Sequence, residues 1–196
     1  DSFEVIADEP KGSPKQAKGF EFINDDLKIK ALQKRAQKIM KEIAKCRNMP
    51  KIYFSSRTHR QVAQLVKELK KNTPYRPRMS VLGSKSQYCI LPEVVNSNSI
   101  DDACLKCRED ESCEAYKRIA GLIKSPKFNR GGEFEVWDIE DMVREGKRVH
   151  ACPYFASRDF AERAELVFCP YNYVIDPMIR KALEIHLKDS IVIIDE

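Results

Sequence analysis

Residues 191–196 read Ile-Val-Ile-Ile-Asp-Glu, and this stretch indicates the fold class. Four consecutive β-branched apolar residues are typical of a central strand in a parallel sheet that is covered on both faces. Asp195 and Glu196 would then lie at the carboxyl edge of the sheet, where α/β proteins bind ligands. In nucleotide hydrolases the first such acid binds Mg²⁺ and the second orients or deprotonates the attacking water. A turn or a helix cap is the simpler interpretation of two acids after a strand.

Strand and helix patterns alternate upstream of this stretch. Apolar, β-prone runs predict further strands at 51–54, 79–82 and 165–169. Apolar spacing and capping residues predict helices over 62–69, around 138–141, from a Ser157 cap to Ala164, and after the pair Asp176-Pro177. The predicted fold class is therefore α/β with a parallel sheet, interrupted by a loop-rich segment that holds most of the cysteines.

The composition is that of a globular protein. Of 196 residues, 42% are apolar and 33% charged, and no apolar run approaches membrane-spanning length, so we expect no membrane partner. Residues 1–24 are predicted to be a flexible lead-in without a secretory signal. Residues 25–47 predict a helix with a lysine-rich face, which either contacts nucleic acid or is solvated. The net charge of +5 is mild evidence for a nucleic-acid partner.

A nucleotide hydrolase also needs a phosphate-binding loop of the form G-x-x-x-x-G-K-[ST], and the sequence contains none. Either the chain is not such an enzyme, or its loop precedes residue 1. The sequence opens without methionine and stops directly after the last predicted strand. We therefore expect it to be a piece of a longer protein.

Four of the seven cysteines fall within residues 89–113. An odd number of cysteines without a secretory signal argues against a disulfide framework. Thiolates bind zinc and iron–sulfur clusters equally well, and the pair Cys104-x-x-Cys107 is typical of a zinc knuckle. The spacing alone leaves both metals open. A non-enzymatic, zinc-stabilised nucleic-acid-binding module is the alternative function.

Four motifs in order resemble the XPD-like superfamily 2 iron–sulfur DNA helicases. The first is the run from Tyr53 to Gln61, and the second is the run from Gly83 to Val94. The third is the sequence Cys-Pro-Tyr, which occurs twice, at 152–154 and 169–171, and the fourth is the run from Ile191 to Glu196. Within this family, residues 137–140, 168–170 and 179–180 most resemble the Fanconi anaemia group J branch, with the telomere elongation regulators close behind. The resemblance extends from about residue 49 to the end.

The resemblance implies a domain plan and an activity. It implies a partial RecA-like motor domain over 25–83 and 154–196, interrupted by an iron–sulfur insert over 84–153 and ending in the first two letters of a DEAH box. The intact enzyme is expected to be a nuclear, ATP- and Mg²⁺-dependent 5′→3′ DNA helicase of repair or genome maintenance. Its expected partners are single-stranded DNA, duplex junctions and repair proteins. The segment alone, without phosphate loop and second motor domain, is expected to be inactive.

The resemblance also implies ligands for a structural [4Fe–4S] cluster: Cys89, Cys104, Cys113 and Cys152. Cys107 is the alternative to Cys104. Cys46 and Cys169 are expected to be buried, unligated thiols. His150 is either a further ligand or a solvated loop residue.

For DNA, the resemblance implies contacts from Arg57, Thr58, His59, Arg60 and Lys85. Guanidinium, hydroxyl and backbone donors at a helix start suit phosphate oxygens. Lys85 stands where the family commonly has arginine, and Leu91 where it commonly has histidine, so two polar contacts of the family are weakened or absent. Tyr171 and Tyr173 are candidates for stacking on bases or for packing. In the same scheme Asp195 holds Mg²⁺ and Glu196 is the catalytic residue that activates water.

Overall fold

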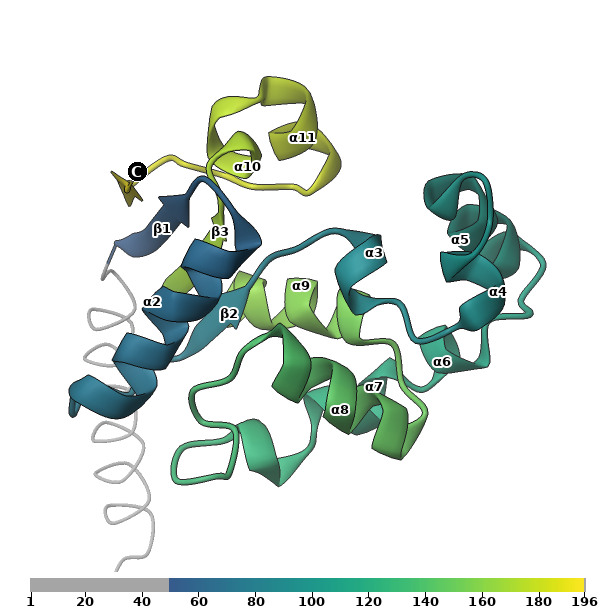
Figure 1. The fold of residues 1–196 in the computed structure, drawn as a ribbon, viewed down its shortest axis with the longest axis horizontal. Helices are drawn as coiled ribbons and strands as arrows, with labels where there is room; N and C mark the ends of the chain where they lie inside the picture. Colours follow the sequence, from purple (N-terminus) through teal and green to yellow (C-terminus); the bar gives the residue numbers. More distant parts are fainter. Residues whose placement is uncertain (1–49, 196) are drawn as a thin grey trace, which may run out of the picture. The chain divides into compact units, whose positions relative to one another are not determined.

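A sheet of four parallel strands organises the part of the chain that this computed structural model describes, residues 50–195. The strands, in the order β2-β3-β1-β4, are β1 (Lys51–Ser56), β2 (Met79–Val81), β3 (Leu166–Pro170) and β4 (Ser190–Ile194) (Figure 1). The predicted α/β class, parallel sheet and four strands are confirmed. The predictions for the lead-in, the lysine-rich helix, Cys46 and Glu196 lie outside the described residues.

The strand register brings the carboxyl ends of three strands to one edge of the sheet. Ile52 of β1 pairs with Leu166 of β3 and Ile191 of β4. Beyond β4, the backbone N–H of Asp195 donates to the carbonyl of Ser55 at 2.8 Å. Asp195 therefore lies directly beside the end of β1.

The prediction that residues 191–194 form a central, covered strand is wrong for the described structure. β4 lies at an edge of the sheet and pairs only with β1 among the described strands. The four residues Ile191 to Ile194 are between 39% and 57% exposed. An apolar, β-branched run predicts that these residues form a strand. It does not predict how many other strands of the described chain pair with that strand.

Two long helices pack beside the sheet, and capping explains where each begins. α2 (His59–Asn72) begins at a capping box in which Thr58 accepts from the backbone of Gln61 and the Gln61 side chain accepts from Thr58. α9 (Pro153–Arg163) begins at a proline that follows Cys152. The predicted cap at Ser157 is wrong: Ser157 lies inside α9, where its hydroxyl donates to the carbonyl of Tyr154.

Short helices fill the chain between β2 and β3. They are α3 (Lys85–Tyr88), α4 (Pro92–Val95), α5 (Ile100–Glu109), α6 (Glu114–Lys117), α7 (Ile119–Ile123), the 3-10 turn η1 (Pro126–Phe128) and α8 (Ile139–Val149). α4 and α5 lie away from the sheet, whereas α7 and α8 pack with α9 (Figure 1). The predicted helix around residues 138–141 is α8, which begins at the cap Asp138 and ends at His150 with a positive φ of 54°.

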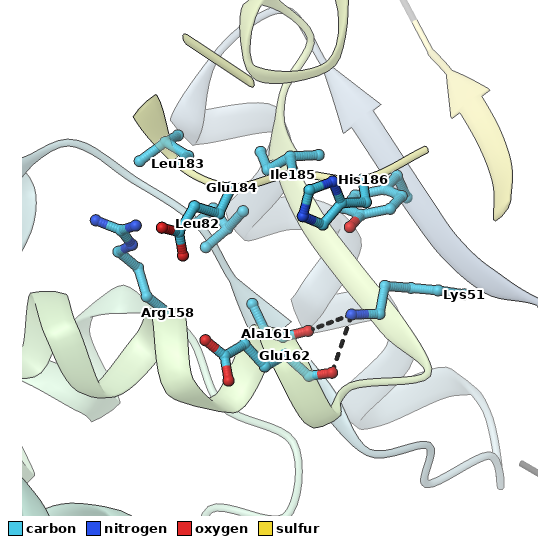
Figure 2. Close-up of a pocket in the computed structure, with 10 residues that line it drawn as sticks. Lys51, Leu82, Arg158, Ala161, Glu162, Leu183, Glu184, Ile185 and His186 are labelled. Carbon is cyan, nitrogen blue, oxygen red and sulfur yellow. Dashed lines mark hydrogen bonds between the residues drawn. The ribbon is translucent and has the colours of Figure 1, made fainter. Parts of the chain in front are cut away.

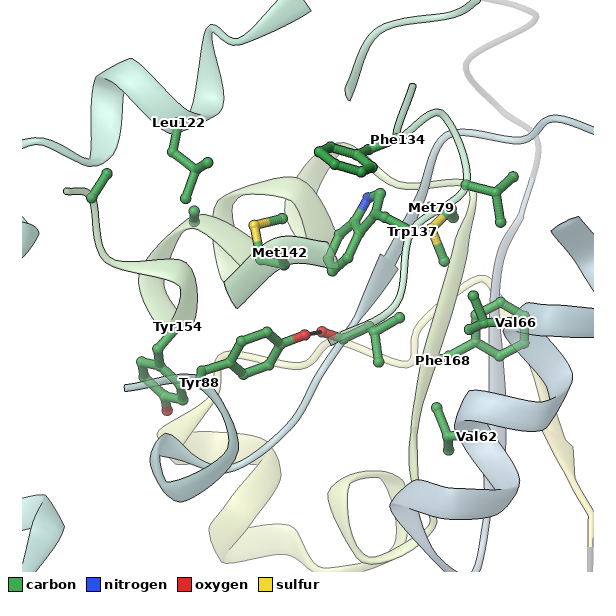
Figure 3. Packing of buried hydrophobic residues seen from close by; sticks show 14 residues of the cluster. Val62, Val66, Met79, Tyr88, Leu122, Phe134, Trp137, Met142, Tyr154 and Phe168 are labelled. Atoms are coloured by element: carbon green, nitrogen blue, oxygen red, sulfur yellow. Dashed lines mark hydrogen bonds between the residues drawn. The ribbon is translucent and has the colours of Figure 1, made fainter. Parts of the chain in front are cut away.

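One apolar core joins these helices to the sheet (Figure 3). Its largest fully buried member is Trp137, 1% exposed, whose ring lies edge-on to Phe128 with ring centroids 5.9 Å apart. Tyr88 is completely buried, and its hydroxyl donates to the carbonyl of Val81 in β2 at 2.6 Å. The helices around Trp137 therefore share their core with the sheet.

Replacing Trp137 by alanine is expected to lower the free energy of unfolding by about 3–5 kcal/mol, because it opens a cavity in this core. The midpoint of a urea unfolding curve measures the loss. Tyr75→Ala is the matched control: this side chain is 74% exposed, and its truncation is expected to cost less than about 0.5 kcal/mol. Equal losses for the two variants would contradict the packing described here.

A second apolar cluster lies around Tyr53, Val167 and Cys169. It includes residues of α10 (Asn172–Ile175), and α11 (Pro177–Ala182) follows. The predicted cap at Asp176 is confirmed, because its carboxylate accepts from the N–H groups of the first turn of α11. None of the helices described is long and apolar enough to cross a membrane.

Candidate metal centre and nucleic-acid interface

Five cysteine side chains from four segments line one small pocket: Cys89, Cys104, Cys107, Cys113 and Cys152. The first directly follows α3, the next two lie on one face of α5, and the others directly precede α6 and α9. The structure thus brings together the four predicted ligands and the alternative Cys107. The rest of the lining is apolar apart from one arginine: Ile90, Leu91, Val94, Ala115, Phe155 and Arg108.

Backbone hydrogen bonds fix where these cysteines lie. The N–H of Cys89 donates to the carbonyl of Lys85 at 2.8 Å, and the N–H of Cys152 donates to the carbonyl of Ala115 at 2.8 Å. The carbonyl of Cys107 accepts from the N–H of Cys113 at 3.1 Å, which closes the turn between α5 and α6. All cysteines in the described part of the chain are free thiols. The backbone of the chain between β2 and β3 therefore determines where these cysteines lie.

Burial raises the pKa values of three thiols of the pocket, Cys89, Cys104 and Cys152. The pKa of Cys152 rises to about 11, because the effect of burial exceeds the opposite effect of hydrogen bonds from the backbone N–H groups of Phe155 and Tyr154. Burial also raises the pKa of Cys89, with a further increase from Cys104 and Cys113. Thiols that raise one another's pKa in this way lie close together, and they lose their protons when a metal group binds.

Cys104 differs from the other thiols because two cations oppose the effect of its burial. Its pKa is raised by desolvation and lowered by Lys85 and Arg108. Cys104 also contributes to the raised pKa of Cys89, and both Cys113 and Cys107 contribute to the raised pKa of Cys104. Cys104 is therefore close to predicted ligands and to the alternative Cys107.

The donor chemistry of the pocket fits an iron–sulfur cluster as well as a structural zinc ion, because thiolates hold both. Structural zinc needs four ligands about 2.3 Å from one ion. Within residues 50–195, no three His, Cys, Asp or Glu side chains are grouped closely enough to hold one ion. His150 is exposed at the end of α8 and does not line the pocket.

A second pocket lies at the carboxyl edge of the sheet. Its lining comes from the start of α2 and from the segment after β3: Arg57, Thr58, His59, Ser84, Pro170, Tyr171, Asn172 and Tyr173. Arg57 is exposed, and the Thr58 hydroxyl is used in the helix cap, donating to Gln61 Oε1 at 2.9 Å. The first-turn N–H groups of α2 and the Arg57 guanidinium suit an anionic ligand.

His59 contributes to this pocket as a neutral ring. Burial lowers its pKa, and its Nδ1 is buried without a hydrogen-bond partner in the described structure. Gly83 makes room for the ring, since an added Cβ there would lie 3.2 Å from His59 Cε1 and 3.1 Å from Tyr88 Cε2. The Ser56 hydroxyl is likewise buried and unpaired among the described residues. Gly83 thus leaves space for the His59 ring, a role that the sequence analysis did not predict.

The other predicted nucleic-acid residues lie outside this pocket. Arg60 is exposed and lines a neighbouring hollow with Gln87. Lys85 forms an ion pair with Asp101, and its Nζ lies 5.6 Å from the ring centroid of Tyr154. Lys85 is also close enough to Cys104 to lower the pKa of its thiol.

The two candidate stacking tyrosines differ in exposure. Tyr173 is only 9% exposed and belongs to the second apolar cluster, and burial raises its pKa to about 12. Tyr171 is 38% exposed. Only Tyr171 offers an open ring face for a base.

A third pocket, shown in Figure 2, lies between the start of β1, the end of α9 and the segment after α11. Lys51 Nζ donates to the carbonyls of Ala161 and Glu162 at 2.7 and 3.1 Å, so it stabilises the carboxyl end of α9. The lining of this third pocket includes the cations Lys51 and Arg158 and the acids Glu162 and Glu184. This balance of charge gives the pocket no preference for an ionic ligand.

Comparison with known proteins gives one family. The DEAD_2 family model matches residues 54–196. The Fanconi anemia group J protein homolog of Gallus gallus is 42% identical over 76% of this chain, which covers 12% of that protein. Regulator of telomere elongation helicase 1 of Mus musculus is 40% identical over 76% of the chain, which covers 12% of that protein. The chain thus spans a small part of the length of the curated relatives it matches.

Two solved structures share the fold. "Truncated XPD" and "XPD_Helicase" each match 76% of the chain with a TM-score of 0.51 and 21% identity, and the chain covers 40% and 24% of them. They support a partial RecA-like fold for the parallel sheet. The family match over most of the chain, with relatives of this identity, shows that the chain belongs to the DEAD_2 family of XPD-like superfamily 2 helicases.

Proposed function

We propose that this chain is the part of an ATP-dependent 5′→3′ DNA helicase that surrounds and includes its iron–sulfur insert. The observation that carries the proposal is the convergence of four predicted thiols, from distant segments, on one pocket in a chain of this family. Repair or genome maintenance in the nucleus is the proposed setting, by analogy with the group J and telomere elongation relatives. Repair proteins are the proposed partners.

The domain plan is part of the proposal. Residues 25–83 and 154–196 would belong to the first motor domain, with 84–153 as the insert. The support is that residues 84–153 lie between β2 and β3 of one sheet and hold most of the pocket. The segment alone would be inactive because its sequence has no phosphate loop and, in this plan, no second motor domain.

Cys89, Cys104, Cys113 and Cys152 would hold the [4Fe–4S] cluster. When bound, the cluster would supply a cross-link between α3, α5, α6 and α9, which carry or adjoin its proposed ligands. α5 supports this role, because none of its residues is fully buried. The cross-link would hold the insert rigid where the duplex separates.

The pocket beside Arg57 would bind the backbone of single-stranded DNA. Arg57 and the first turn of α2 would contact phosphate, Thr58 would fix the start of the helix, and the neutral His59 would accept or donate one hydrogen bond. Arg60 and Lys85 would contact DNA beyond this pocket. Asp195 would bind Mg²⁺ with ATP, and Glu196 would activate water.

Metal and acid-labile sulfide analysis of the anaerobically purified intact protein tests the proposal. About four irons and four sulfides per chain, with 5′→3′ unwinding that needs ATP, is the expected result. A colourless protein with zinc and no sulfide would replace the proposal with the zinc-stabilised, non-enzymatic module.

Replacing Arg57 by alanine is expected to weaken binding of single-stranded DNA about tenfold at low salt, because one phosphate contact is lost. The slope of log affinity against log salt should also fall by about 0.7, the value for one released counterion on a single strand. Fluorescence anisotropy at several salt concentrations measures both quantities. Arg130→Ala, which removes another exposed arginine outside this pocket, is expected to change neither. Equal effects of the two variants would contradict the proposed contact.

A further inference from the structure

Arg108 is the one charged residue in the lining of the cysteine pocket. It lies on α5 one helical turn after Cys104, so both side chains share a face of the helix. The guanidinium carbon lies 4.8 Å from the ring centroid of Phe155 and 5.1 Å from that of Tyr116. Arg108 is half-buried between these rings. Its side chain is therefore held in one place beside the thiols.

No acid in the described residues pairs with this arginine. The described ion pairs do not include Arg108, and its guanidinium makes no hydrogen bond within residues 50–195. The neighbouring cation Lys85, in contrast, is paired with Asp101. A half-buried guanidinium with five N–H donors and no acceptor is costly unless an anion lies nearby.

The proposed contents of the pocket would be such an anion. A [4Fe–4S] cluster with four thiolate ligands carries net negative charge, and its sulfur atoms accept hydrogen bonds. We propose that Arg108 is the charge partner of this cluster: its guanidinium stabilises the negative charge and, through Tyr116 and Phe155, holds α5 against α6 and α9. This inference rests on the proposed function, since it requires that the cysteines bind a cluster.

The two aromatic rings explain why arginine suits this position. Tyr116 lies on α6 just after Cys113, and Phe155 lies on α9 just after Cys152. The two rings contact each other edge-on with centroids 4.8 Å apart. A guanidinium at this distance from both rings is attracted to them while its N–H fork can still donate several hydrogen bonds, whereas a lysine ammonium lacks the planar fork. Arg108 is thus a positioning residue for three of the ligand-bearing segments.

The reduction potential of the cluster tests this inference on the full-length protein. An added one-electron reductant such as dithionite gives the cluster one electron, no bond is made or broken, and the cluster gains one negative charge. Removing a nearby positive charge disfavours that step. In Arg108→Gln the ratio of reduced to oxidised cluster at a fixed potential is expected to fall about tenfold, which corresponds to about 59 mV for one electron. Electron paramagnetic resonance during a redox titration measures this ratio.

Lys106→Gln is the matched control. Lys106 is an exposed base in the same last turn of α5, so its replacement removes the same charge and the same interaction with the helix dipole. It is expected to shift the ratio less than about twofold, because water screens an exposed charge. Equal shifts in Arg108→Gln and Lys106→Gln, or no shift in either, would overturn the inference.

Arg108→Lys separates charge from packing. Because it keeps the charge, its potential is expected to stay near that of the unmodified protein. If it falls as far as that of Arg108→Gln, the charge is not the cause and the inference is wrong. If circular dichroism shows that Arg108→Gln folds but the variant loses its iron, and Arg108→Lys keeps its iron, the need for a cation is supported. Loss of iron in both variants overturns the inference. An unmodified protein without iron and sulfide would instead refute the proposed function.

Discussion

Cys104→Ser is expected to remove most of the iron and acid-labile sulfide from the protein, whereas Cys107→Ser is expected to leave both in place. Both residues face the pocket from α5. Cys104 is coupled to Cys89 and Cys113 and has two cations that favour its thiolate. A serine hydroxyl is a poor substitute for a thiolate on iron, so the loss of a true ligand should be close to complete. Iron and sulfide assays with a visible spectrum measure the result.

Cys169→Ser controls for the loss of a thiol that lies elsewhere. Cys169 is fully buried in β3, and burial raises its pKa to about 12. It belongs to the second apolar cluster and not to the pocket lining. Its replacement should preserve the cluster while lowering stability. The reverse pattern, with the cluster lost in Cys107→Ser and kept in Cys104→Ser, would make Cys107 the ligand.

The sequence was sufficient to predict the strands, because each is a short apolar run bounded by turns. It also predicted the cap at Asp176 and a helix over 62–69, which the structure extends to His59–Asn72, since both depend on residues near one another in the chain. The cap at Ser157 was predicted wrongly because Pro153 already begins α9, and proline is favoured in the first turn. Local signals compete, and the stronger one decided the boundary.

The candidate site could be predicted only in part for a different reason. The resemblance to the helicase family selected the four cysteines but could not show that Cys107 faces the same pocket as Cys104. It also gave no sign that the Arg108 guanidinium lies close to aromatic rings on two other helices. These relations depend on how α5, α6 and α9 pack, and such contacts between distant segments leave no local pattern. The exposure of β4 was not predicted for the same reason, because it depends on which distant segments pack beside that strand.

Asp195→Asn in the intact protein is expected to lower the rate of ATP hydrolysis at least about 100-fold. The carboxylate lies exposed at the carboxyl edge of the sheet, and the backbone N–H of Asp195 is held by the carbonyl of Ser55. Asparagine has nearly the same shape, so the backbone should stay in place. Its neutral amide oxygen, however, binds Mg²⁺ more weakly, and the loss of several kcal/mol of metal-dependent stabilisation corresponds to this factor.

Asp189→Asn provides the comparison that separates metal binding from a general loss of negative charge. Asp189 is also exposed, and it lies at the opposite end of β4 with a φ of 56°, a conformation that asparagine tolerates well. Its replacement should leave hydrolysis unchanged. Because the proposed role of Asp195 is to bind Mg²⁺, a higher Mg²⁺ concentration should partly restore the activity of Asp195→Asn. Full activity in Asp195→Asn, or equal losses in both variants, would show that the acid after β4 is part of a turn and not of a metal site.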